Sequence, residues 1–128
     1  MINGAHFLLY SKDEEADRAF FRDVLEFRPV DVGEGWLIFA LPPAELAVHP
    51  ASRTFTRRQG GHAMMGAVLY LMCSDLEGVV KSLKAKKVKC AKIGKAPWGS
   101  YTTLLLPSGV EMGLYQPTHP TAHRLKAK

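Results

Sequence analysis

Glu111 is the carboxylate whose position first suggests chemistry. The stretch PSGVEMGLYQP, residues 107–117, reads as a tight turn followed by a short strand. Alternate residues of a strand share one face, so Glu111, Gly113 and Tyr115 are predicted to point the same way. In an apolar hollow the pKa of Glu111 would rise, and the carboxyl group would then suit a general base. The alternative is an ordinary solvated strand residue.

Four aromatic side chains and one arginine are candidates for binding a small molecule. Trp36 and Trp98 precede equivalent predicted strands, and Tyr70 and Tyr115 lie on strands of their own. Core packing with satisfied polar atoms is the simpler interpretation of these rings. Arg57 lies in the basic run RTFTRR, residues 53–58, and a guanidinium there can hold a carboxylate or phosphate of a ligand. A solvated charge run is the alternative.

Length and composition indicate a globular protein of one domain or two small halves. The chain has 128 residues and a net charge of +5. No apolar run approaches the roughly 20 residues of a membrane span, and the first residues lack the features of a secretion signal. The lysines between residues 81 and 95 fall late in a predicted helix and beyond it, where cations suit the helix dipole, so nucleic-acid binding is not expected. Cys73 and Cys90 form no disulfide or metal-site spacing, which favours reduced thiols and a cytoplasmic location.

Two similar series of predicted helices and strands position these residues. In the first half, a helix over 11–27 begins at Ser11 or Asp13 and ends before Pro29, with strands predicted at 5–10, 28–32, 36–41 and 46–50. In the second half, a helix over 74–87 begins at Ser74 or Asp75. The strands of that half are predicted at 67–73, 88–93, 100–106 and 110–117.

The two halves match closely enough to indicate an internal repeat. Asp13 and Asp75 are separated by 62 positions, as are Trp36 and Trp98. We therefore predict a single domain that spans 1–128, with module one at 2–50, a linker at 51–66, module two at 67–117 and a basic tail at 118–128. The linker is either a mobile connection or a functional lid or arm.

The paired modules resemble the vicinal oxygen chelate superfamily, which contains glyoxalase I, bleomycin- and fosfomycin-resistance proteins and extradiol dioxygenases. AHFLLYSKDEEADRAFFRDVLEF is similar to that family's opening strand and helix, and LPSGVEMGLYQP to its closing turn and strand. The resemblance covers residues 2–117. It implies an α+β fold in which two βαβββ modules form a curved mixed β-sheet around a central cleft. It also implies a homodimer and a small-molecule ligand.

The resemblance implies metal ligands at four strand positions, of which this chain keeps one. His6 falls on a ligand position, whereas the other three positions carry Ala47, Val68 and Gly113. His49 and Glu111 each lie two residues away from a ligand position, a displacement of about 6.6 Å along a strand. Metal–ligand bonds are only about 2 Å long, so a shifted site would require coherent movement of its ligands.

Two functions follow from these positions. The first is a binder without a resident cofactor, which holds an aromatic or cationic compound in an aromatic-lined cleft. The second is a metal-dependent lyase or extradiol-type dioxygenase in which His6, His49 and Glu111 hold one divalent iron, zinc or manganese ion.

Overall fold

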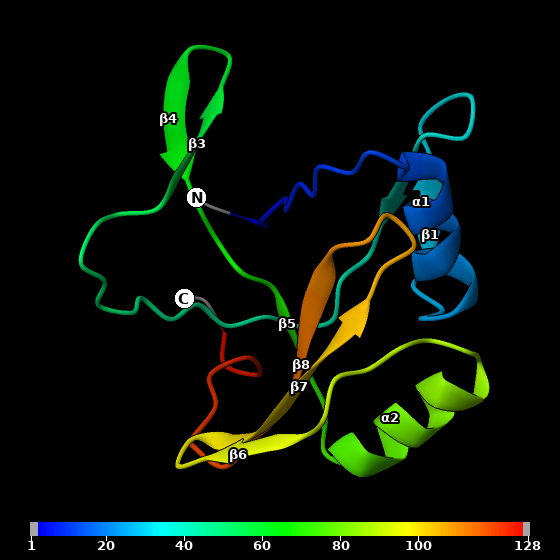
Figure 1. Ribbon diagram of the computed structural model, residues 1–128. Coiled ribbons are helices and arrows are strands. Elements are labelled where there is room, and N and C mark those ends of the chain that lie inside the picture. The colour runs from blue at the N-terminus through cyan, green and yellow to red at the C-terminus, as the bar shows by residue number, and fades with distance from the viewer. Residues whose placement is uncertain (1–2, 127–128) are drawn as a thin grey trace. The chain divides into compact units, whose positions relative to one another are not determined.

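The computed structural model describes residues 3–126, which divide into two compact units (Figure 1). The first unit extends to Ala40 and includes the returning segment Leu106–Val110. The second unit contains Leu41–Leu105 and resumes at Glu111. Within the described residues, no helix is long and apolar enough to cross a membrane.

The first unit is built on α1 (Glu14–Asp23) and a short antiparallel pair, β1 (Pro29–Asp31) with β2 (Leu37–Phe39). The Asp13 carboxylate accepts the Ala16 amide at 3.3 Å, so Asp13, one of the two predicted candidates, caps the helix. Phe21 is buried on α1, and its ring meets those of Phe27 and Phe39 at centroid distances of 5.7 and 5.8 Å. These aromatic contacts join the helix to the strand pair.

The second unit contains a four-stranded mixed sheet in the order β5-β8-β7-β6. Its strands are β5 (Tyr70–Met72), β6 (Gly94–Ala96), β7 (Gly99–Leu105) and β8 (Glu111–Pro117). The pairing of β5 with β8 is parallel, and the pairings of β7 with β8 and with β6 are antiparallel. The sheet therefore brings residues from both ends of this half of the chain into neighbouring positions.

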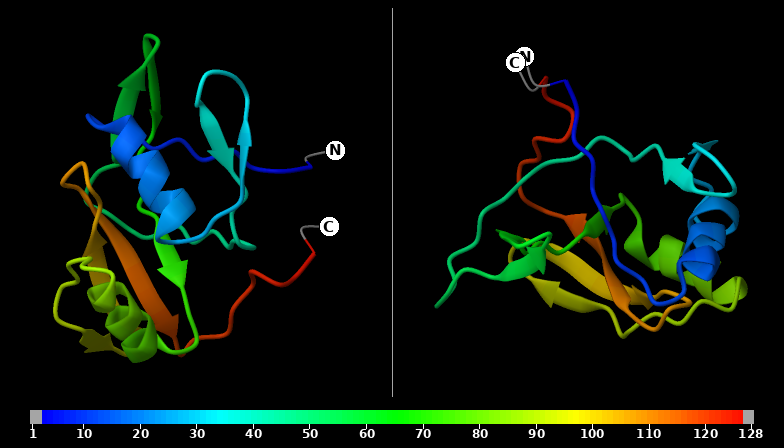
Figure 2. Two further views of the ribbon diagram at one scale, coloured as in Figure 1. Left: turned by 90° about the vertical axis from the view of Figure 1, so that its right-hand side faces the viewer. Right: turned by 90° about the horizontal axis from the view of Figure 1, so that it is seen from above.

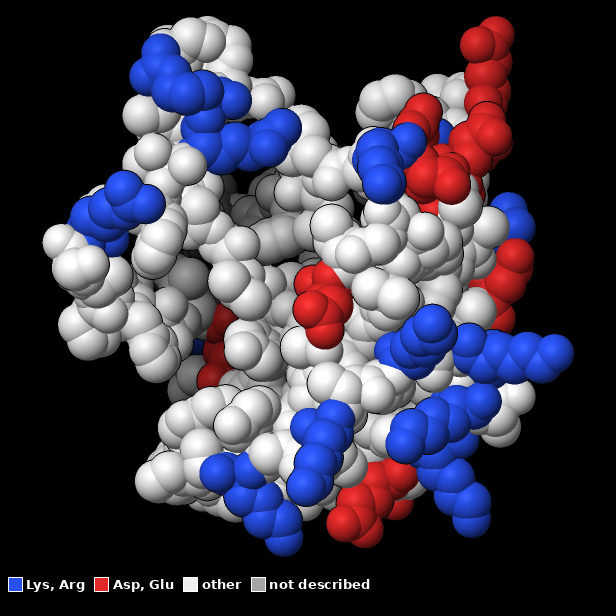
Figure 3. Space-filling view, in the orientation of Figure 1, with Lys and Arg blue, Asp and Glu red and all other residues white. Residues whose placement is uncertain are grey.

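The helix α2 (Leu76–Ala85) covers one face of this sheet (Figure 2). The buried core of the unit consists of Leu76, Val80, Leu83, Val88, Leu104, Met112 and Leu114. The Asp75 carboxylate caps the helix by accepting the Gly78 amide at 3.1 Å, and Gln116 Oε1 accepts the Leu76 amide at 2.9 Å. Exposed lysines follow the last turn of α2, where cations suit the helix dipole, and Figure 3 shows basic side chains over this part of the molecule.

The segment predicted as a linker forms a hairpin. It contains β3 (Thr56–Gln59) and β4 (His62–Met65), which pair antiparallel, and every residue of both strands is exposed. Gly60 and Gly61 supply the positive φ angles, 55° and 82°, that a two-residue hairpin turn needs. Residues 51–66 are therefore partly ordered rather than a structureless connection.

The α+β fold is confirmed, but three predicted strands are wrong. Residues 5–10 and 46–50 form no strand, and 88–93 contributes only the isolated bridge between Cys90 and Leu104. The physical reason is that apolar composition measures suitability for a sheet, whereas a strand also needs a partner for its backbone hydrogen bonds. The second half forms all four strands and the helix of the predicted series, with β6 (Gly94–Ala96) in place of the strand predicted at 88–93, whereas the first half forms only the helix and two strands.

Candidate functional site

The face of the second unit's sheet opposite α2 carries the candidate site. Strand register places Tyr101 beside Tyr115, and Tyr70 beside Gly113. Because alternate strand residues share a face, Glu111, Gly113 and Tyr115 lie on one side and the buried residues Met112 and Leu114 on the other. The predicted common orientation of the first three residues is therefore confirmed.

Four rings gather on this face, and we call Tyr70, Trp98, Tyr101 and Tyr115 the aromatic floor. Trp98 stacks on Tyr101 at a centroid distance of 5.1 Å and meets Tyr115 edge to face at 5.8 Å. Tyr70 also meets Tyr115 edge to face, at 5.6 Å. Tyr70, Trp98 and Tyr101 remain 41%, 41% and 37% exposed. The rings therefore contact one another and still present apolar surface for a ligand.

Two glycines make room for the floor. A Cβ atom on Gly113 would collide with the ring of Tyr70, and one on Gly94 would collide with the ring of Tyr101. Each tyrosine consequently lies over the bare backbone of a neighbouring strand. Gly113 occupies a position at which the family resemblance implies a metal ligand, and in this chain the ring of Tyr70 fills that space.

The position of Trp98 is fixed by the segment that follows β8. The Thr118 amide donates to the Trp98 carbonyl at 3.0 Å, and the Thr118 hydroxyl donates to the Pro97 carbonyl at 2.9 Å. Gly99 has a φ angle of 150° and packs so closely on the Gln116 carbonyl that a Cβ atom would not fit. The turn that carries the indole is therefore held on both sides.

A cluster of polar side chains, His119, Glu45 and His123, adjoins the aromatic floor at Tyr115. The Tyr115 hydroxyl lies 3.3 Å from His119 Nε2, and the two rings stack at a centroid distance of 6.0 Å. Glu45 Oε1 accepts the Ala122 amide at 3.0 Å and lies 3.4 Å from His123 Nδ1. These contacts tie residues 118–123 to the floor on one side and to the segment around Glu45 on the other.

Two pKa shifts determine the charge states of Tyr115 and Glu45. Burial raises the pKa of Tyr115 above its usual value, and the nearby negative charge of Glu45 adds to the rise. The hydrogen bond from the Ala122 amide holds the pKa of Glu45 below its usual value, with a further contribution from His123. The phenol therefore stays protonated and the carboxyl group stays ionised in neutral solution.

Three of the predicted ligand-binding residues belong to the floor, namely Tyr70, Trp98 and Tyr115. Trp36 lies in the first unit, where the guanidinium carbon of Arg18 lies 4.7 Å from the centroid of the indole ring. Arg57 is an exposed residue of β3. Roles for these two residues in ligand binding stay predictions.

Sequence reasoning missed Tyr101, Glu45, His119 and His123. Tyr101 could have been found from the register of the β7–β8 hairpin, which places it opposite Tyr115. No sequence signal marks the other three residues, because they lie in segments without helix or strand and meet only through tertiary contacts.

The predicted metal ligands occupy separate settings. His6 and His49 are exposed residues of segments that form no strand, and Glu111 accepts the Thr103 hydroxyl at 2.6 Å. No group of three or more His, Cys, Asp or Glu side chains is gathered for a metal ion among residues 3–126. Val68 and Gly113 cannot supply ligands, so the second unit does not fit the metal set that the family resemblance implies. The site of His6, His49 and Glu111 stays a prediction, as does the role of Glu111 as a base.

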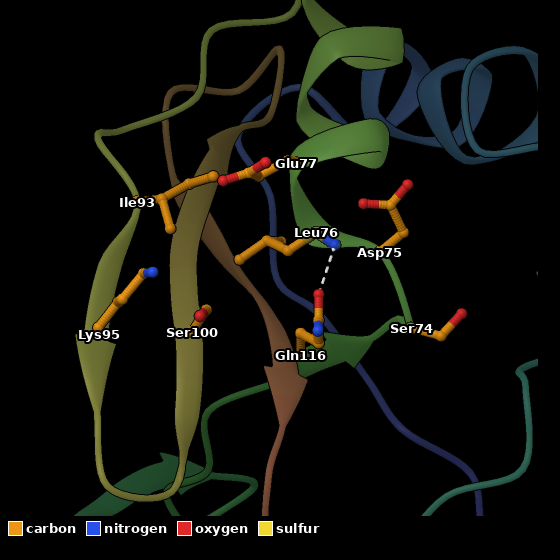
Figure 4. Close-up of a pocket in the computed structure, with 8 residues that line it drawn as sticks. All are labelled: Ser74, Asp75, Leu76, Glu77, Ile93, Lys95, Ser100 and Gln116. Atoms are coloured by element: carbon orange, nitrogen blue, oxygen red, sulfur yellow. Dashed lines mark hydrogen bonds between the residues drawn. The ribbon is translucent and has the colours of Figure 1, made fainter.

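A hollow lies on the α2 side of the same sheet (Figure 4). Eight residues line it: Ser74, Asp75, Leu76, Glu77, Ile93, Lys95, Ser100 and Gln116. The Gln116 side chain in this hollow is committed to the first turn of α2 through the Leu76 amide. Acidic, basic and apolar side chains line the hollow, and the hydrogen bond between Gln116 and the Leu76 amide stabilises the start of α2.

The chain belongs to the Glyoxalase/Bleomycin resistance protein/Dioxygenase superfamily, whose family model matches residues 4–114. This match confirms the resemblance to the vicinal oxygen chelate proteins. No curated protein sequence matches the chain at a significant level.

Solved structures with this fold align over nearly the whole chain. TnmS3, an antibiotic binding protein from Streptomyces sp. CB03234, is 21% identical with a TM-score of 0.58, and the alignment covers 92% of this chain and 100% of TnmS3. Lactoylglutathione lyase from Agrobacterium tumefaciens is 15% identical with a TM-score of 0.59, over 89% and 92% of the two chains. The fosfomycin resistance protein FosX from Listeria monocytogenes is 14% identical with a TM-score of 0.56, over 98% and 100%. At these identities the likeness shows the fold alone.

Proposed function

We propose that this protein binds a planar aromatic small molecule on the aromatic floor, without a metal ion held by its own side chains. The observation that carries the proposal is the set of four contacting rings on one sheet face, of which Tyr70, Trp98 and Tyr101 remain about 40% exposed. Stacked or edge-to-face aromatic pairs contribute about 0.5–1.5 kcal/mol each beyond the burial of their area. A ligand ring that contacts Trp98 and Tyr70 would gain free energy both from the burial of its apolar area and from aromatic pairing.

The chemistry of the floor and one related structure support a binder. Glu111 is paired with Thr103, and the space beside Gly113 is filled by Tyr70, which leaves this face without a set of metal donors. TnmS3, which shares the fold, is an antibiotic binding protein. Sequestering an aromatic compound requires stacking surface and no reactive group, and the floor supplies such a surface.

Nuclear magnetic resonance tests the proposal directly, with 2-naphthol as the probe. In the Trp36→Phe variant the one remaining indole N–H signal belongs to Trp98. We expect 2-naphthol to shift that signal, and to show saturation transfer from the protein. The Trp98→Ala variant should weaken binding, whereas Trp36→Phe should bind like the original protein. Equal binding by both variants would contradict the proposal.

The same proposal includes a homodimer in the cytoplasm. A two-stranded hairpin alone is marginally stable in water, yet β3 and β4 are exposed throughout, and Phe55 and Met65 beside and within them are 63% and 77% exposed. A second copy of the chain is the partner that we propose for this apolar surface. The free thiols of Cys73 and Cys90 suit a reducing compartment.

A further inference from the structure

His119 has a defined proton arrangement, because one of its ring nitrogens faces a group that can only accept. Nδ1 lies 2.7 Å from the Pro120 carbonyl oxygen, so Nδ1 carries the proton. A neutral imidazole has only one ring proton, which leaves Nε2 as an acceptor. The contact of 3.3 Å between Nε2 and Tyr115 Oη is then a hydrogen bond in which the Tyr115 hydroxyl donates.

This arrangement determines what Tyr115 can offer to a ligand. Its hydroxyl proton is directed to His119, so its free lone pair can only accept a hydrogen bond. The polar end of the floor therefore presents the Tyr115 oxygen as an acceptor to a bound molecule.

We propose that Tyr115, oriented by His119, makes the aromatic floor selective for planar rings that carry an N–H or O–H donor. The proposal rests on the proposed function, because it concerns the same floor. A ring with only ether or carbonyl oxygens at that place would leave the Tyr115 oxygen without a partner when water is displaced. Discrimination of this kind arises from the cost of an unpaired polar group.

The proton arrangement reverses when His119 is protonated. Both ring nitrogens then donate, Nε2–H points to Tyr115 Oη, and the Tyr115 hydroxyl is released to donate to a ligand. The titratable and charged groups around the pair are Glu45 and His123, and Tyr70 contacts Tyr115 from β5. The floor then no longer favours ligands that donate a hydrogen bond and can also bind ligands that accept one.

Two matched probes test the selectivity at pH 7.5, where 2-naphthol has a hydroxyl donor and 2-methoxynaphthalene has none. We expect 2-naphthol to bind roughly fivefold more tightly, the ratio of dissociation constants that corresponds to one neutral hydrogen bond. Tyr115→Phe keeps the ring and should bring the ratio close to one. Tyr101→Phe removes a hydroxyl of the same floor that has no part in the pair, and the ratio should persist.

His119→Phe provides the second variant, because it keeps a ring stacked on Tyr115 and removes the acceptor nitrogen. The released hydroxyl can then donate or accept, so the preference for 2-naphthol over 2-acetylnaphthalene should fall. In the original protein, nitrogen-15 shifts of the His119 ring should report protonated Nδ1 and bare Nε2. The same preference should fall as those shifts report full protonation.

The outcomes separate this inference from the function on which it rests. If neither naphthalene binds, the proposed function fails. If both bind the original protein equally, or the nitrogen-15 shifts report a proton on Nε2 instead of Nδ1, the floor binds rings and the selectivity is wrong. A ratio that survives Tyr115→Phe would also overturn the inference, and amide spectra of each variant show whether its fold is kept.

Discussion

At the scale of single residues, two glycines and two tyrosines explain why this sheet face holds rings where the family resemblance implies a metal ligand. Gly113 leaves room for Tyr70, and Gly94 leaves room for Tyr101. A side chain at position 113 and the ring of Tyr70 compete for one volume. The ring of Tyr70 can therefore lie on this face only because position 113 carries no metal-binding side chain.

Gly113→Ala tests this competition. We expect the alanine methyl group to force Tyr70 from its place and to lower the free energy of unfolding by about 1–3 kcal/mol, as overpacking of a filled site does. Urea unfolding measures the loss. In a Tyr70→Ala background the same substitution should cost little, because the space is then empty. Gly4→Ala is the control, since a Cβ atom there meets nothing within 4 Å. Equal costs in both backgrounds would contradict the shared volume.

Metal content is the second prediction at this scale. The protein purified from medium supplemented with iron, zinc and manganese should hold well under one equivalent of any of them, because residues 3–126 gather no group of three or more His, Cys, Asp or Glu side chains, and Glu111 is bonded to Thr103. Elemental analysis measures the content. About one equivalent that disappears in His6→Ala would instead support the metal-dependent alternative.

At the scale of elements, local signals predicted the helices well and the strands less well. The helix starts were predicted at Ser11 or Asp13 and at Ser74 or Asp75. Asp13 and Asp75 are the residues that accept an amide three residues on. A helix end is determined by neighbouring residues, so sequence suffices. Residues 5–10 have the composition of a strand, yet they form none. The floor shows the same limit, since Tyr115 was predicted to face Glu111's side, but its contact with His119 depends on the path of the chain after β8.

The segment after β8 should loosen in acid. Because the fold lowers the pKa of Glu45, this carboxylate stabilises the folded state above the pKa of the unfolded chain, and the contribution is lost as pH falls through the folded pKa. Hydrogen exchange at the Ala122 amide should therefore become less protected relative to the core amide of Leu104 in acid. Glu45→Ala should show the low protection already at neutral pH. Protection at Ala122 that is independent of both changes would contradict the role of Glu45.

At the scale of the whole molecule, membership of the superfamily follows from the sequence, and the activity does not. The family model covers most of the chain, and the sequence had already indicated the family through its repeat. One fold hosts many chemistries, so the function must be argued from the side chains of this chain. The second unit carries the aromatic floor and also the β3–β4 hairpin, whose exposed apolar residues we propose to be covered by a partner.

Association through the hairpin is the prediction that belongs to this scale. Met65→Lys places a charge on the 77% exposed apolar side chain of β4, and burying that charge against a second copy would be costly. Sedimentation velocity should show a dimer for the original protein and a shift toward monomer for this variant. Ser82→Lys adds the same charge to an exposed position of α2 and should remain dimeric. If the original protein sediments as a monomer at micromolar concentration, the hairpin needs another partner, and the floor must then bind its ligand with residues of one chain.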